Sequence, residues 1–132
     1  MKKIAIVGTS QLKTRQEDQI RDLIMELFNT INDEFMVISG GAKGIDTIAM
    51  KTAKHCGIET MIFNPKKQTW YYFKKRNLKM AEECDELYCI SVPTITEPCY
   101  HHDKPQDHQK TAGCWTLNEA LKMGKKCRLY II

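Results

Sequence analysis

Short apolar runs alternate with segments of helical periodicity along most of this 132-residue chain. The apolar runs predict strands at 2–7, 35–38, 60–63, 86–90 and 126–131. Between them, apolar residues recur every three or four positions, which predicts helices at 15–29, 46–55, 73–84 and 116–123. Parallel neighbours in a sheet need crossover connections, and helices of this length supply them. The alternation therefore predicts an α/β fold, a Rossmann-like three-layer sandwich with a central, mainly parallel five-stranded sheet.

One segment interrupts this alternation. Residues 91–110 hold three of the four prolines, three of the four histidines and no periodic apolar pattern. Loops of this length are usually functional or mobile, so we interpret the segment as an insertion over a ligand site. The rest offers residues for one core only, and we expect residues 1–132 to form a single domain.

Composition excludes several classes of protein. Hydrophobic residues make up 42% and charged residues 27%, as in globular domains, and no apolar run approaches the ~20 residues of a membrane span. The apolar stretch after Met1 covers only 4–7, which is too short for a signal peptide. We expect a cytoplasmic protein with no membrane partner, in which the six cysteines are reduced thiols.

The most informative motif is a glycine-rich turn between the second predicted strand and the helix that follows it. Glycine tolerates positive φ and lets main-chain N–H groups approach a ligand, while the first turn of a helix leaves its own N–H groups unpaired. The motif therefore predicts a phosphate site, although a plain strand-to-helix turn with Asp46 favoured by the helix dipole is the alternative. A Walker A loop is excluded because Lys43 is followed by glycine. The motif consists of Ser39, Gly40, Gly41, Ala42, Lys43, Gly44 and, inside the helix, Asp46.

Two further loops belong to the same predicted site. In open parallel sheets the ligand lies beyond the carboxyl ends of the strands, where the strand order reverses. The loops after the first, second and fourth strands should therefore converge. Outside the glycine-rich turn they contribute Gly8, Thr9 and Ser10, and the segment that ends at Thr116.

Three blocks resemble the SLOG superfamily, which unites DNA-processing protein A with the Lonely Guy phosphoribohydrolases, and above all its small YspA-like members. Ser39–Asp46 is similar to their S-G-G-A-R-G-I-D loop, with lysine in place of arginine. Arg76 and Asn77, followed by Met80, resemble their R-N-x-x-M helix. The block 111–119 resembles the P-G-G-x-G-T-x-x-E loop of Lonely Guy enzymes, although Trp115 stands where that loop has a glycine.

The resemblance implies a protein that binds a nucleotide or nucleotide-derived ligand, as a sensor or a nucleotide-processing protein, and that forms a homodimer or higher oligomer. It adds Trp70 as the residue that stacks on the base, and Asn77, Thr111, Gly113 and Thr116 as ligand contacts. The alternative is a phosphoribohydrolase that cleaves the N-glycosidic bond of nucleoside 5′-monophosphates. In that enzyme Arg76 and Glu119 would hold the catalytic positions, because a carboxylate can stabilise an oxocarbenium-like ribose and a guanidinium can anchor phosphate.

Single-stranded DNA binding is a lesser alternative, and nucleic acid is not the expected partner. It would depend on lysines that follow the backbone and aromatic rings that stack on bases. These are Lys66, Lys67, Lys74, Lys75 and Lys79, with Trp70, Tyr71, Tyr72 and Phe73.

A zinc site is the last alternative, in and beside the long loop. Its candidate ligands lack the paired C-x-x-C spacing of a structural zinc site, so we predict no metal and no cofactor. These candidates are Cys99, His101, His102, His108 and Cys114.

Overall fold

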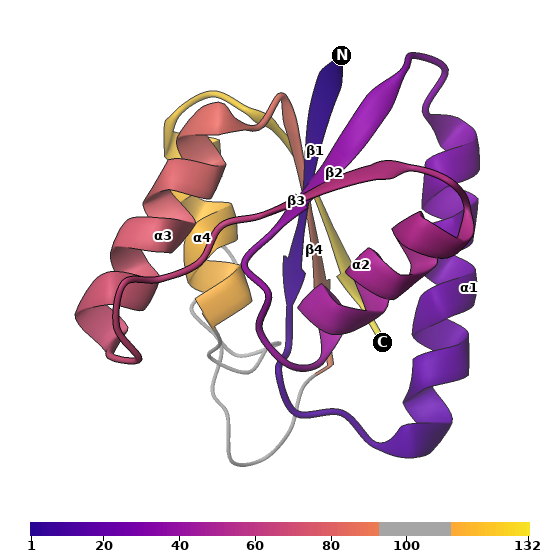
Figure 1. The fold of residues 1–132 in the computed structure, drawn as a ribbon, viewed down its shortest axis with the longest axis horizontal. Coiled ribbons are helices and arrows are strands. Elements are labelled where there is room, and N and C mark those ends of the chain that lie inside the picture. The colour runs from indigo at the N-terminus through magenta and orange to yellow at the C-terminus, as the bar shows by residue number, and fades with distance from the viewer. Residues whose placement is uncertain (93–111) are drawn as a thin grey trace.

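The computed structural model describes residues 1–92 and 112–132, and strands and helices alternate through both ranges (Figure 1). The predicted insertion at 91–110 therefore lies almost wholly outside the described residues. The strands are β1 (Lys2–Gly8), β2 (Phe35–Ser39), β3 (Glu59–Ile62), β4 (Glu86–Ser91) and β5 (Lys126–Ile131). The helices are α1 (Thr14–Thr30), α2 (Ile45–His55), α3 (Trp70–Glu83) and α4 (Ala112–Lys122).

The five strands form one sheet in the order β3-β2-β1-β4-β5, and every neighbouring pair is parallel. This confirms the predicted Rossmann-like sheet. Ile4 of β1 lies opposite Val37 of β2 on one side and Glu86 of β4 on the other. The strand order reverses at β1, so the space between the ends of β1 and β4 is the switch point where such sheets bind ligands.

Helices cover both faces of the sheet and complete the predicted three layers (Figure 1). The helices α1 and α2 bury their apolar faces in one core cluster, which includes Ile24 and Ile45. The other cluster takes its helical residues from α3 and α4, among them Met80 and Leu117. None of the helices in the described ranges has the length and hydropathy needed to cross a bilayer.

Two helices begin earlier than the sequence predicts. The helix α3 begins at Trp70 rather than at 73. The sequence did not predict this first turn because its side chains are aromatic and largely exposed, so that they show no apolar periodicity. The helix α4 begins at Ala112 rather than at 116, so the segment predicted to be a loop around Gly113 is helical. Gly113 has no positive φ. A Cβ there would lie 2.6 Å from Gly8 Cα, so this glycine permits close packing rather than a turn.

Candidate ligand site at the carboxyl edge of the sheet

Three segments meet at the switch point through Thr9, which directly follows β1. Its N–H donates to the carbonyl of Ile90 at 3.2 Å, and its own carbonyl accepts from the N–H of Ile45 at 3.0 Å. Its hydroxyl accepts from the N–H of Val92 at 2.8 Å. The ends of β1 and β4 and the start of α2 are thereby joined. Thr9 is fully buried, whereas Ser10 is exposed beside it.

The glycine-rich turn between β2 and α2 needs glycine for its shape. Gly41 and Gly44 have φ of 70° and 78°, which disfavour residues with a Cβ. A Cβ on Gly44 would also lie 2.3 Å from the carbonyl oxygen of Thr9 and 2.6 Å from that of Ser10. The turn is therefore pressed against the end of β1.

Side chains of the turn satisfy some of its own N–H groups. Gly41 donates to the hydroxyl of Ser39 and Ala42 donates to the carboxylate of Asp46, both at 3.3 Å. The hydroxyl of Thr47 donates to the carbonyl of Ala42 at 2.7 Å and closes the turn. Among the described residues, no group accepts from the main-chain N–H of Lys43 or Gly44. These two N–H groups are the ones that the turn leaves available to an anion.

Asp46 is the buried acid of the site, with 7% of its surface exposed. Burial disfavours its charged form and raises its pKa to about 6. The hydrogen bond from Ala42, the charge of Arg76 and the main chain of Gly40 oppose that rise. Asp46 therefore holds the turn in place at the cost of a desolvated carboxylate.

Arg76 of α3 reaches the same turn from the other face of the sheet. Its Nη1 donates to the carbonyl of Gly40 and, at 3.4 Å, to that of Phe63, while its Nε donates to Asn77 Oδ1 at 2.7 Å. A Cβ on Gly40 would lie 2.7 Å from the guanidinium carbon, which explains the glycine there. Burial lowers the pKa of Arg76 and the nearby Asp46 opposes this. No described group accepts from Nη2, so one edge of a fixed guanidinium stays open.

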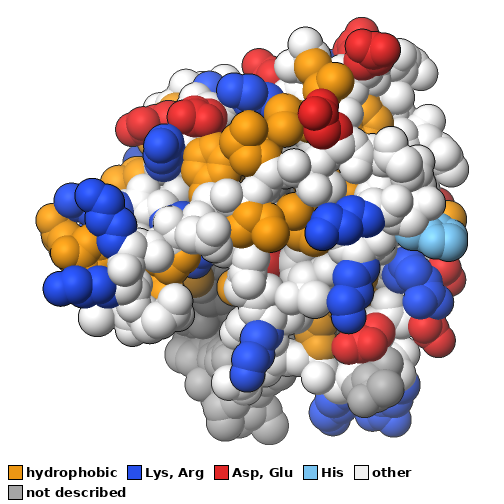
Figure 2. All heavy atoms as spheres, in the orientation of Figure 1, with side chains coloured by type: hydrophobic (Ala, Val, Ile, Leu, Met, Phe, Trp, Pro, Cys, Tyr) orange, Lys and Arg blue, Asp and Glu red, His pale blue; other side chains and the backbone are white. Residues whose placement is uncertain are grey.

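Trp70 begins α3 and is 48% exposed. Its ring meets that of Trp115 edge to face, with centroids 5.6 Å apart, and the Lys74 ammonium lies 5.6 Å from the Trp115 ring. Trp115, which departs from the glycine of Lonely Guy loops, therefore joins α4 to α3. Over the first turns of α3, hydrophobic and basic side chains alternate on the surface (Figure 2).

The structure does not bring Glu119 to the switch point. Glu119 lies six residues after Gly113 in α4, which is about 9 Å along the helix axis from the contact with Gly8. Its carboxylate forms an ion pair with Lys122 at 3.5 Å. Thr116, also predicted as a ligand contact, is fully buried, and its hydroxyl donates to the carbonyl of Ala112 at 2.8 Å.

Several predicted residues lie outside the described ranges, namely Thr111, Cys99, His101, His102 and His108. Cys114, the remaining zinc candidate, is buried with its Sγ 4.0 Å from that of Cys89. In residues 1–92 and 112–132, no group of three or more His, Cys, Asp or Glu residues could hold a metal ion.

Sequence reasoning missed the parts of the site that are main chain or depend on distant packing. The carbonyl of Phe63 holds Arg76, and the hydroxyl of Thr9 holds the end of β4. Thr9 itself was predicted as a ligand contact from its position after a strand, but its hydrogen bond to the end of β4 was not. The hydroxyl of Thr47 gave no signal, because one threonine in a helix is ordinary.

Fold and site together define a Rossmann-like α/β protein with a glycine-rich turn at its switch point. Residues 1–109 match the family model described as DNA recombination-mediator protein A. The chain belongs to that family, which confirms the SLOG superfamily expected from the sequence. A search of curated proteins finds no match.

Two solved structures share the fold. DNA processing protein A from Streptococcus pneumoniae superposes with a TM-score of 0.58 at 18% identity, over 98% of this chain and 59% of that one. TM1055, a structural genomics target, superposes with a TM-score of 0.67 at 17% identity, over 96% of this chain and 72% of that one. The chain thus spans little more than half the length of the Streptococcus protein. At these identities the likeness is one of fold.

Proposed function

We propose that this protein binds a phosphate-bearing, nucleotide-derived ligand at the glycine-rich turn. The observation that carries the proposal is the pair of open donors on either side of that turn. Within residues 1–92 and 112–132, the N–H groups of Lys43 and Gly44 and the Nη2 of Arg76 have no hydrogen-bond acceptor. Main-chain N–H groups at a helix start and a fixed guanidinium are the two donor types that suit phosphate oxygens.

The surroundings add charge and a stacking surface. Lys43 is exposed, so its ammonium can follow a phosphate held by its own N–H. Trp70 keeps about half of its surface exposed and is the candidate partner for a base. The family model is named for DNA recombination and the Streptococcus protein for DNA processing, and both names are consistent with a nucleotide-related ligand.

Hydrolysis of nucleoside monophosphates finds less support. A glycosidase needs a carboxylate at the sugar, and Glu119 lies down the helix and pairs with Lys122. Asp46 is close to Arg76, but its carboxylate accepts the N–H of Ala42 in the turn itself. We therefore favour a binding protein that senses its ligand.

Thermal unfolding in the presence of AMP, ADP, NAD and adenosine tests the proposal. A ligand at ~100 times its dissociation constant should stabilise the fold by ~2.7 kcal/mol. Arg76→Gln should weaken binding of the phosphorylated ligands, while Lys54→Ala, an exposed lysine on α2 away from the turn, should not. The proposal is wrong if no nucleotide raises the unfolding temperature, or if adenosine binds as well as AMP.

Single-stranded DNA is a second candidate, favoured by the aromatic residues at the start of α3. Tyr71 is 59% exposed and has the Lys75 ammonium 4.8 Å from its ring centroid, and Lys67 lies 5.9 Å from the ring of Tyr72. Rings bordered by lysines suit stacked bases and their phosphates. Anisotropy of a labelled oligo-dT should then fall steeply with salt and be lost in Tyr71→Ala. Absent or salt-insensitive binding rejects this candidate.

We also propose self-association, with exposed Leu121 of α4 as one part of the seam. Sedimentation of wild type and Leu121→Glu tests it, since a charged residue in a seam should shift the protein to monomers.

A further inference from the structure

We propose that the groove between α1 and α2 binds additional phosphoryl groups, so that the preferred ligand carries an oligophosphate chain rather than one phosphate. This inference rests on the proposed function, because the groove begins at the turn that would hold the first phosphate. It assigns a role to a surface that lies outside the switch point.

The groove has the size of a small-molecule site. Its volume is about 700 Å³, within the range of ligand clefts. Lys43 and Gly44 line one end, so the groove begins at the glycine-rich turn. Ile48 lines its wall on α2 and is 9% exposed.

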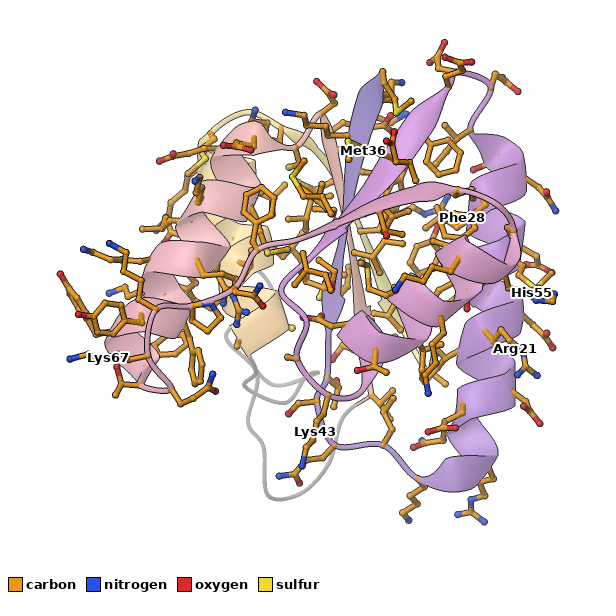
Figure 3. The ribbon with its side chains drawn as sticks, viewed as in Figure 1. Arg21, Phe28, Met36, Lys43, His55 and Lys67 are labelled. Carbon is orange, nitrogen blue, oxygen red and sulfur yellow. The ribbon has the colours of Figure 1, made fainter. Side chains whose placement is uncertain are left out.

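Basic side chains from both helices line the groove. Thr47, Lys51 and His55 follow one another at intervals of four residues, which places them on one face of α2. Arg21 contributes from α1. Figure 3 places Arg21 and His55 toward one end of α2 and Lys43 at the other. Lys51 lies seven residues after Gly44, about 10 Å along the helix, within reach of an extended phosphate chain.

The two lysines of the groove, Lys43 and Lys51, have no acidic partner among the described residues. Among the described residues, Glu17 is the one carboxylate that lines the groove, and no carboxylate lies within 4.0 Å of the Lys43 or Lys51 ammonium. Arg21 pairs with Asp18 on its own helix at 2.7 Å, which holds the guanidinium at the groove wall. Like charges gathered along one cleft repel one another, and a polyanion that enters the cleft removes that repulsion. Figure 2 shows Lys and Arg side chains over α1 and α2, with Asp and Glu side chains among them.

The test is a binding series by calorimetry with AMP, ADP, ATP and inorganic tripolyphosphate, in buffer with EDTA so that the phosphates carry no metal. For wild type the affinity should rise at least tenfold from AMP to ATP. Lys51→Ala should abolish that rise and leave AMP binding unchanged. The matched control is Lys54→Ala, which removes the same charge from the same helix outside the groove. Arg21→Ala should act like Lys51→Ala, whereas Arg15→Ala on α1 should not.

Each outcome separates the two proposals. If AMP and ATP bind equally, or if Lys54→Ala reduces the gain as much as Lys51→Ala, the groove has no specific role and the inference is overturned, while the turn keeps its function. If tripolyphosphate binds in a manner that needs Lys51 and no nucleotide binds, the groove stands and the proposed nucleotide site falls. If nothing in the series binds, both are rejected.

Discussion

Replacement of Asp46 by asparagine should stabilise the protein at neutral pH and leave its stability at low pH almost unchanged. Asp46 is buried, and its pKa is raised from the ordinary 3.8 to about 6. Between these two values the folded protein holds a proton that the unfolded chain has released. Stability from this group is therefore complete below pH 3.8, falls as the pH rises toward 6, and stays low above it.

The size of the effect follows from the shift. A pKa difference of about 2 between the folded and unfolded chain corresponds to about 3 kcal/mol of unfolding free energy, since a difference of 1 corresponds to ~1.36 kcal/mol. Asparagine has nearly the same shape and can still accept from the N–H of Ala42, but it never carries the desolvated charge. The variant should gain on wild type by about 3 kcal/mol, most of it between pH 4 and pH 6.

Urea unfolding of both proteins at half-unit steps from pH 4 to pH 7.5 measures this gain. Subtracting one curve of unfolding free energy against pH from the other cancels the contribution of every other titrating group. Asp22→Asn, which neutralises an exposed carboxylate on α1, reports the general effect of one charge. A constant difference between wild type and Asp46→Asn across this range would refute the account of a buried, charged Asp46.

Three other predictions concern the stability of the fold. Gly44→Ala should lower the free energy of unfolding in urea by several kcal/mol, and Gly57→Ala by only ~1 kcal/mol. Both glycines have positive φ, but only Gly44 is pressed against backbone oxygens. Equal losses of stability in the two variants would contradict this close contact. Gly113→Ala should disturb α4 and lower the unfolding temperature, because its Cβ would meet the backbone of Gly8; an unchanged melting curve would show that this packing is loose. Burial alone would raise the pKa of Glu86, but hydrogen bonds from Lys2, Tyr88 and Lys126 lower it to about 2. As the pH falls from 5 to 2, wild type should therefore lose about 3 kcal/mol of its free energy of unfolding relative to Glu86→Gln. Parallel acid-unfolding curves of the two proteins would contradict this.

The fold was predictable because every layer of it leaves a periodic signal. Strands buried on both faces appear as short apolar runs, such as Ile4–Val7 and Val37–Ile38, and glycines stop two helices at Gly57 and Gly124. The all-parallel order then follows from the helical crossovers. The starts of two helices at the site were harder to predict. The first turn of α3 at Trp70 is exposed and leaves no buried periodic signal, and Gly113 lies in α4 against Gly8, a contact that its local sequence does not show.

The candidate site was predictable only in part. The turn at 39–44 could be recognised in the sequence because three glycines in six residues are rarely needed for any other purpose. Arg76 was identified through its R-N-x-x-M context. The sequence could not predict which hydrogen-bond partner each polar group has. Asp46 and Ser39 satisfy N–H groups of the turn, and the Arg76 guanidinium is tied to two carbonyl oxygens. Such pairings depend on the three-dimensional contact of distant segments.

The same pairings favour ligand binding over turnover. A turn held by its own carboxylate, its own hydroxyl and a tethered guanidinium is rigid before the ligand arrives, so binding an anion there requires little ordering of the chain. Catalysis would need a carboxylate left free at the sugar, and of the two acids considered, Asp46 is committed to the turn and Glu119 lies about 9 Å along α4 from the switch point. Because the described part of the chain offers open donors at the turn and no free acid beside them, we propose that the protein recognises a phosphorylated ligand and holds it unchanged.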